Sequence, residues 1–214
     1  MAEFTSTTFG TISGRHGSAV ATTIKKSGKS ILKVFKAPSN PKTPKQVAQR
    51  TKFGFAIVIL ACLRAMFNIT FRTKGGADYG IGLAMREAIM GTSPNFSLDY
   101  SKLKFSEGSM KKTGVMTVTK MADMDMDVKV DWNVTNIIPN DAIANVDDSV
   151  NLIFLCEDYN EAMLFDNSSF RIDATVTVTL PDYWATTKVH CWMYFSRADG
   201  QLNSNSQYFG ALQM

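Results

Sequence analysis

Alternating apolar and polar positions dominate the second half of the chain. The clearest run is MDMDVKVDWN, residues 124–133, where Met, Val and Trp alternate with Asp, Lys and Asn without a break. A period of two is that of a β-strand with one buried face. Similar or shorter apolar runs between polar turns occur at residues 102–106, 115–120, 150–157, 162–165, 172–180, 188–196 and 207–212. Short strands at this spacing predict an antiparallel β-sandwich.

The first half of the chain has a different pattern. Residues 18–36 place apolar positions on two arms around the sequence KSGK, where Gly28 supplies a positive φ, and so predict a β-hairpin. After the hairpin, Thr43 stands directly before Pro44, and Gln46 follows three residues after Thr43. This is a Thr-x-x-Gln capping box with proline at the first helical position. It predicts one long helix from Thr43 to about Thr73.

The middle of that helix, FGFAIVILACL, is apolar on every side. A second, shorter helix is expected at residues 79–90, after the glycines of KGGADYG. A helix that is apolar all round must be covered on all sides, and one hairpin and one short helix offer too little surface. The run is also shorter than the roughly 20 residues that span a bilayer. We therefore expect no membrane span and a homo-oligomer in which other copies cover the helix.

Charge divides the chain at about the same place as the hydrophobic pattern. The chain has 214 residues and a net charge of +4. Its first 75 residues carry thirteen Lys and Arg and one acidic residue, a net charge of +12, whereas the remainder carries ten basic and eighteen acidic residues, a net charge of −8. This asymmetry predicts two modules: a basic hairpin-plus-helix assembly module at residues 1–97 and a β-sandwich at residues 98–214.

No arrangement of residues in the sequence indicates catalysis or metal binding. Asp123, Asp125 and Asp127 are spaced like the start of a calcium loop, but valines occupy the later positions that need Gly and Glu. They are interpreted as the solvated face of a strand. His16 lies in a glycine-rich segment, and His190 is expected to point outward from a sheet, with no nucleophile motif near either. We expect no enzymatic activity, no cofactor, no metal and no small-molecule substrate.

Basic residues around the hairpin and the helix start are the main candidates for a contact surface. They are Lys25, Lys26, Lys29, Lys33, Lys36, Lys42 and Lys45. Such a surface is suited to non-specific phosphate contacts with DNA. However, the aromatic residues nearby resemble core residues, and no platform for base stacking is visible. The favoured interpretation is that the basic face docks on the acidic half of neighbouring copies.

The order of these segments resembles an uncharacterised family of Bacteroidetes and their phages. The sequence SGRHGSAV, the hairpin, NPKTPKQVAQR, the helix, GTSPNFSLDYSKL and the sandwich follow one another as in that family. Its core motif is Asn-Pro-Arg-Thr-x-x-Gln-x-x-x-Arg. The matching residues are Asn40, Pro41, Thr43, Gln46 and Arg50, with Lys42 in place of the usual arginine. Segments similar to this motif occur in small proteins encoded among phage head and tail genes.

The last third of the chain resembles the end of a fibronectin type III-like domain. A strand ends at Leu180 and Pro181, a tyrosine-bearing corner follows, and a long hairpin turns at Asp199 and Gly200. Trp132 fits the core tryptophan of such sandwiches. The resemblance implies a binding or spacer module more than an enzyme.

Taken together, the expected fold is α+β: an N-terminal β-hairpin and helices, followed by an antiparallel fibronectin/Ig-like β-sandwich. The expected function is that of a non-enzymatic structural protein that self-assembles and bridges to other particle proteins. The resemblance implies a phage virion or phage-like particle, and synthesis in the bacterial cytoplasm follows because no signal peptide is visible. The alternative is a DNA-contacting accessory protein that uses the basic half.

Overall fold

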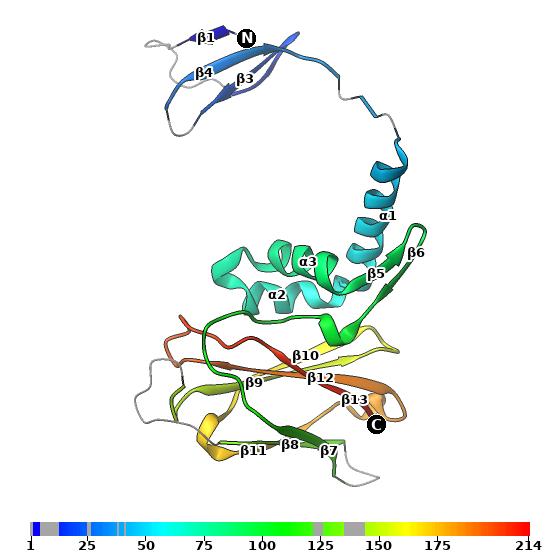
Figure 1. The fold of residues 1–214 in the computed structure, drawn as a ribbon, viewed down its shortest axis with the longest axis vertical. Coiled ribbons are helices and arrows are strands. Elements are labelled where there is room, and N and C mark those ends of the chain that lie inside the picture. The colour runs from blue at the N-terminus through cyan, green and yellow to red at the C-terminus, as the bar shows by residue number, and fades with distance from the viewer. Residues whose placement is uncertain are drawn as a thin grey trace. The chain divides into compact units, whose positions relative to one another are not determined.

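The chain forms two compact units, Met1–Thr43 and Pro44–Met214 (Figure 1). A computed structural model describes residues 2–4, 13–24, 27–37, 39–40, 42–121, 126–134 and 144–214. The expected division after residue 97 falls inside the second unit. The reason is that the helices share one hydrophobic core with strands of the C-terminal half.

The first unit is an antiparallel sheet. Its strands are β1 (Ala2–Phe4), β2 (Gly14–His16), β3 (Ala19–Thr23) and β4 (Ser30–Val34), in the order β1-β4-β3-β2. Strands β3 and β4 are the predicted hairpin. Gly28 lies in its turn with a φ of 65°, as the sequence requires.

The second unit begins with helices and ends with two antiparallel sheets. The helices are α1 (Pro44–Ile59), α2 (Arg64–Thr70) and α3 (Gly76–Glu87), with 3-10 turns at Ala61–Leu63, Arg72–Lys74, Tyr100–Lys102, Arg171–Asp173 and Asp182–Trp184. A small hairpin follows α3, formed by β5 (Ile89–Thr92) and β6 (Asn95–Leu98). One sheet has the order β10-β9-β12-β13, with β9 (Ser149–Cys156), β10 (Glu161–Phe170), β12 (Lys188–Ser196) and β13 (Gln207–Gln213). The other has the order β11-β8-β7, with β7 (Met116–Lys120), β8 (Asp127–Trp132) and β11 (Thr175–Thr179).

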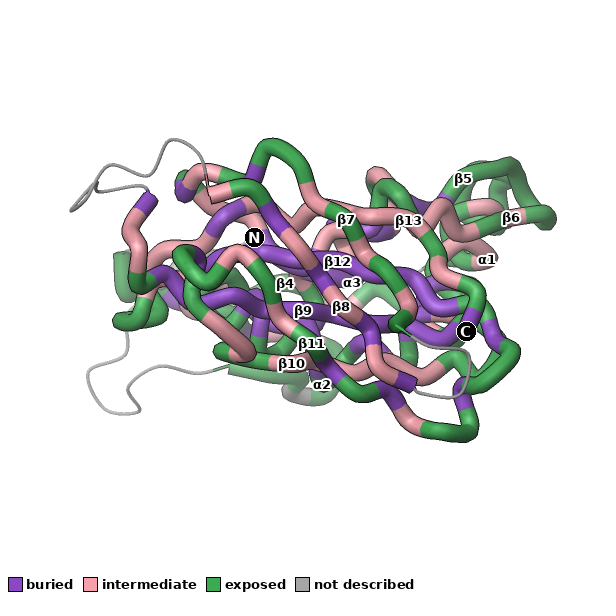
Figure 2. Tube along the Cα trace, turned by 90° about the horizontal axis from the view of Figure 1, so that it is seen from below, coloured by how far each residue is buried: buried purple, intermediate pink, exposed green. Residues whose placement is uncertain are grey.

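Strands β9 and β12 are buried on both faces, and this places them at the centre of the second unit (Figure 2). Leu152 and Phe154 of β9 pack toward the β11-β8-β7 sheet. Ile153 and Leu155, on the opposite face, pack with the helices. The unit therefore has three layers: helices, the sheet containing β9 and β12, and the β11-β8-β7 sheet (Figure 1). The expected α+β class is confirmed at this level.

The long predicted helix is broken. Helix α1 ends at Ile59, and the segment Ala61–Thr70 continues at an angle of 61° to it. No proline or glycine lies at the break, where Leu60 has φ −98° and ψ 11°. Leu60 and Leu63 are fully buried, so the bend lets both sides of an apolar segment reach the core. The chain itself therefore covers much of the second half of this segment, and cover by other copies stays a prediction.

The predicted strands are present in the described residues except in one segment; residues 124 and 125 lie outside the described residues, and residues 171–173 form a 3-10 turn before β11. Residues 102–106 are not a strand, although Phe105 N–H donates to Ser206 Oγ at 2.9 Å. In β8, Val128, Val130 and Trp132 are buried and alternate with partly exposed residues, as the period of two predicts. Among the described residues no single helix is long and apolar enough to cross a membrane; α1 and Ala61–Thr70 meet that length and composition only as a bent pair.

An ion pair lies inside the sandwich. Asp148 Oδ2 is 2.9 Å from Arg171 Nε, and both side chains are almost completely buried. Arg171 also donates from Nη2 to the carbonyl of Lys111, and its guanidinium stacks on the Phe195 ring at 3.7 Å. Trp132 Nε1 donates to the carbonyl of Arg171 at 2.8 Å. The pair and its contacts therefore connect the two sheets.

We expect that Asp148→Ala lowers the free energy of unfolding by about 3–5 kcal/mol, because it leaves the Arg171 guanidinium buried without its counter-charge. Asp147→Ala is the matched control: Asp147 is exposed, and its loss is expected to cost less than about 0.5 kcal/mol. Urea unfolding of the two variants provides the measurement. Equal costs would show that the buried pair adds nothing specific.

Candidate assembly surface

Helix α1 begins at Pro44, directly after Thr43, as the capping pattern predicts. Ala56 of α1 and Leu60, which directly follows α1, are fully buried. Phe53 and Gln49 lie one and two turns earlier on the same face, at the i, i+3/i+4 spacing of a helical stripe. Phe53 is 52% exposed and Gln49 is also exposed. The face by which α1 is anchored therefore continues toward Pro44 without cover.

Two of the motif residues, Gln46 and Arg50, share this uncovered face of α1. Gln46, Arg50 and Phe53 follow one another at intervals of four and three residues, so they project from one side of α1. Together with Gln49 and Gly54 they line a shallow hollow along the helix. The spacing Gln-x-x-x-Arg thus places an amide and a guanidinium beside an exposed aromatic ring.

The predicted basic residues are exposed wherever the structure describes them. These are Lys29, Lys33, Lys36, Lys42 and Lys45. Lys25, Lys26 and the motif residue Pro41 lie outside the described residues. Lys45 belongs to the second unit and the others to the first, so a single continuous basic face stays a prediction.

The first unit has almost no core of its own. Among its described side chains, only Ala21 and Ser30 are buried. Leu32 and Val34 are 38% and 77% exposed. Units of about this length seldom bury enough apolar surface to be stable alone. The sheet therefore needs a further surface against its apolar residues.

A second exposed surface lies around the turn between β9 and β10. We call it the acidic-aromatic patch; its residues are Glu157, Asp158, Tyr159, Glu161, Asp182 and Tyr183. The rings of Tyr159 and Tyr183 meet edge to face at 5.6 Å, and each residue is more than half exposed. Tyr183 Oη donates to Glu161 Oε2 at 2.7 Å, which holds one ring in place. The sequence showed no periodic signal for this patch, because Asp182 and Tyr183 join it only through the fold.

His190 is buried rather than outward-facing, which corrects the expectation from the sequence. It is 3% exposed, with Tyr100 stacked on its ring at 4.0 Å between centroids. Its Nδ1 lies 2.8 Å from Tyr208 Oη and its Nε2 lies 3.3 Å from Glu157 Oε2. Lys188 Nζ is 3.2 Å from the same carboxylate oxygen. The cluster joins a carboxylate, an imidazole and a phenol in one hydrogen-bonded chain.

Burial lowers the pKa of His190, and the hydrogen bond that it donates to Glu157 opposes this only in part. The pKa of Glu157 is lowered as well: burial raises it, but hydrogen bonds from Lys188 and His190 outweigh that effect. His190 is therefore neutral at neutral pH; its Nε2 donates to the Glu157 carboxylate, and its Nδ1 accepts from Tyr208 Oη.

The described parts of the chain contain no group of three His, Cys, Asp or Glu side chains that could hold a metal ion. Asp123 and Asp125 lie outside the described residues, and Asp127 accepts a hydrogen bond from Thr179 Oγ1 at 2.5 Å. Asp127 is thus engaged within the β11-β8-β7 sheet.

We expect protonation of His190 to destabilise the fold. Its pKa in the folded chain is below its usual value of about 6.5, so the unfolded chain binds the proton more readily and stability falls as the pH drops below about 6.5. Unfolding in urea at pH 7.5 and 5.5 measures this loss. In His190→Gln the loss should be smaller; Glu157 titrates below this window in either state. An identical pH dependence in both proteins would contradict the assignment.

Comparison with known proteins gives one family. Residues 11–210 match a family of unknown function, DUF6266. No curated protein and no solved structure matches the chain. The matched range begins before the hairpin of the first unit and ends in β13, so it includes the motif at the start of α1 and both sheets of the second unit. The chain therefore belongs to the DUF6266 family of unknown function.

Proposed function

We propose that this protein is a non-enzymatic structural protein that self-associates, and that the first turns of α1 in one copy dock on the acidic-aromatic patch of the next. The uncovered stripe of α1 is the observation that carries the proposal. Ala56 is the only buried residue of α1, whereas Val47, Phe53 and Val58 are 43%, 52% and 72% exposed. Exposed apolar side chains on a projecting helix are typical of an interaction surface.

The charges of the two surfaces are complementary. Helix α1 carries Lys45, Arg50 and Lys52 and has no acidic residue. The acidic-aromatic patch has four carboxylates, with Lys188 as the basic residue beside them. Opposite potentials steer association and suppress wrong partners. Phe53 and the two exposed tyrosines supply the aromatic contact that anchors many interfaces.

Contact between two different surfaces is heterologous. Such contacts build rings when the rotation closes and filaments when it does not, so one contact type can assemble many copies. The virion or phage-like particle implied by the family resemblance needs a repeated contact of this kind. The first unit, with its small core, supplies a second surface for bridging to another component.

We further propose that the two sheets of the second unit form a fibronectin/Ig-like sandwich. The strand order supports this, because β8 pairs with β11 and β9 pairs with β12. Counted from β7 to β13, the two sheets have seven strands. The second strand pairs with the fifth, and the third pairs with the sixth, as in an Ig-like Greek key. At the corner before β12, Trp184 is fully buried and Tyr183 is exposed. Such a module fits a spacer or binding role.

Light scattering coupled to size exclusion tests the assembly. The wild type is expected to exceed its monomer mass of 23.6 kDa, because α1 and the patch of different copies associate. Phe53→Glu should yield a monomer with an unchanged thermal midpoint, since the residue is half exposed. Val115→Glu is the matched control: Val115 is 65% exposed and lies on neither surface. A wild type that stays monomeric at high concentration would remove the proposal.

Mixing two variants tests whether the contact is head to tail. Phe53→Glu disrupts the binding surface of α1 but leaves the acidic-aromatic patch intact. Tyr159→Lys disrupts the patch but leaves the α1 surface intact. Each alone should be monomeric, and an equimolar mixture should form a pair with one intact contact. A symmetric contact between two helices would instead leave Tyr159→Lys associated on its own, because its helix is intact, and that result would exclude the patch as the receptor.

The exposed lysines also support a test of the DNA alternative. We expect no shift of a random-sequence duplex at about 150 mM salt, because the basic residues have no stacking platform. Gel shift at low and physiological salt is the measurement, with Lys33→Glu/Lys36→Glu as the comparison. Binding that persists at the higher salt and disappears in the double variant would make DNA contact the better proposal.

A further inference from the structure

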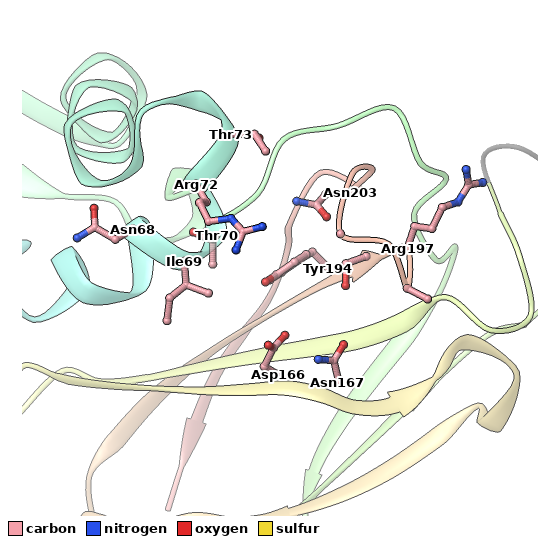
Figure 3. A pocket seen from close by; sticks show the side chains of 13 residues that line it. Asn68, Ile69, Thr70, Arg72, Thr73, Asp166, Asn167, Tyr194, Arg197 and Asn203 are labelled. Atoms are coloured by element: carbon pink, nitrogen blue, oxygen red, sulfur yellow. The ribbon is translucent and has the colours of Figure 1, made fainter.

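We propose that a cavity in the second unit binds a small zwitterion, a molecule that carries both a carboxylate and an ammonium group. The cavity has a volume of about 370 Å³ and lies between the end of α2 with its following turn and the strands β10 and β12 (Figure 3). Its lining is mostly polar and contains three charged residues, Arg72, Arg197 and Asp166; the guanidinium of Arg197 points away from the other two (Figure 3). This site is separate from the assembly surfaces and stands on independent observations.

One wall is basic. Arg72 follows α2 in a 3-10 turn, and its guanidinium points into the cavity (Figure 3). Among the described residues it has neither an ion-pair nor a hydrogen-bond partner. On the same wall, Thr70 is 6% exposed and its Oγ1 has no hydrogen-bond partner within the described chain. Buried hydroxyls without a partner are rare in folded proteins, and this one lies within the wall that carries Arg72.

The opposite wall is acidic and is held by a distortion of β10. The register of β10 against β9 shifts between Phe165 and Ser169, and Asn167 has a φ of 50°. The fully buried Asn151 holds this bulge, because its Oδ1 accepts from Asn167 N–H at 3.0 Å and its Nδ2 donates to Ser196 Oγ at 2.8 Å. Bulges of this kind re-aim side chains and occur often beside binding sites.

Asp166 lies on this bulge and lines the cavity (Figure 3). Within the described chain its carboxylate has no ion-pair partner. Tyr194, also in the lining, is 5% exposed. Burial raises the pKa of Tyr194, and the charge of Asp166 raises it further. The phenol therefore stays protonated beside the carboxylate and can donate a hydrogen bond to a ligand.

The charges of Arg72 and Asp166 indicate the class of ligand. Arg72 and Asp166 stand on facing walls and do not form a salt bridge with each other. A simple anion would pair with Arg72 but face repulsion from Asp166, and a simple amine would have the converse problem. A neutral polyol would leave both charges unpaired. A carboxylate placed at Arg72 and an ammonium placed at Asp166 satisfy both at once, while Asn68 and Asn203 line the space between them.

Titration followed by amide NMR shifts tests the proposal. The probes are glycine, 4-aminobutyrate and 6-aminohexanoate, which vary the distance between the charges, with butyrate and butylamine as single-charge analogues of the second. At least one amino acid is expected to bind ten times more tightly than either analogue, with shifts confined to residues around the cavity. Arg72→Gln and Asp166→Asn should each weaken that binding at least tenfold.

Two controls make the outcome decisive. Arg86→Gln removes an exposed arginine of α3 outside the cavity and should leave binding unchanged. The Arg72 and Asp166 variants should keep the wild-type thermal midpoint, because neither side chain has a partner in the described chain. The proposal is overturned if no amino acid binds, if butyrate binds as tightly as the amino acids, or if neither cavity variant weakens binding. The comparison of probes on the wild type decides the question even if a variant fails to fold.

Discussion

Burial of β9 and β12 on both faces is the constraint on which the second unit depends. A strand with two apolar faces must be covered twice, and an antiparallel sheet alone covers neither face. The β11-β8-β7 sheet covers one face and the helices cover the other. The helices therefore share one hydrophobic core with these strands. Their largest side chains, such as Phe67 and Phe71, complete the core begun by Trp192 of β12.

Local patterns in the sequence predict much of this fold. The period of two identifies β8, the turn glycine identifies the β3–β4 hairpin, and the proline after Thr43 marks the start of α1. Each of these depends on residues that are close along the chain. The bend at Leu60 does not: nothing in ILACL distinguishes a straight helix from a broken one. It results from contacts with strands about ninety residues later in the sequence.

The candidate sites show the same distinction. The motif predicts which residues begin α1, and their helical spacing implies that Gln46 and Arg50 share a face. The burial of His190 could not be predicted, because the apolar run of β12 hides which face carries the helices. Likewise, the sequence shows Asp148 only as one of two adjacent acidic residues in a polar turn. The fold places it against Arg171, which is 23 residues later in the chain. Arg72 and Asp166 line one cavity only because the fold places α2 beside the bulge of β10.

The anchoring of α1 at one end has a mechanical consequence. Sixteen residues at 1.5 Å per residue make a rod of about 24 Å, and Ala56 and Leu60 hold only its last turns. The rod acts as a lever whose fulcrum lies at the bend, so a small rotation there becomes a displacement of several ångströms at Pro44. A load at Pro44 reaches the three layers through the last turns of α1, where the helix also contacts α3 and β5. A partner bound to the first turns of α1 could therefore change the tilt of the helix while the core of the second unit keeps its packing.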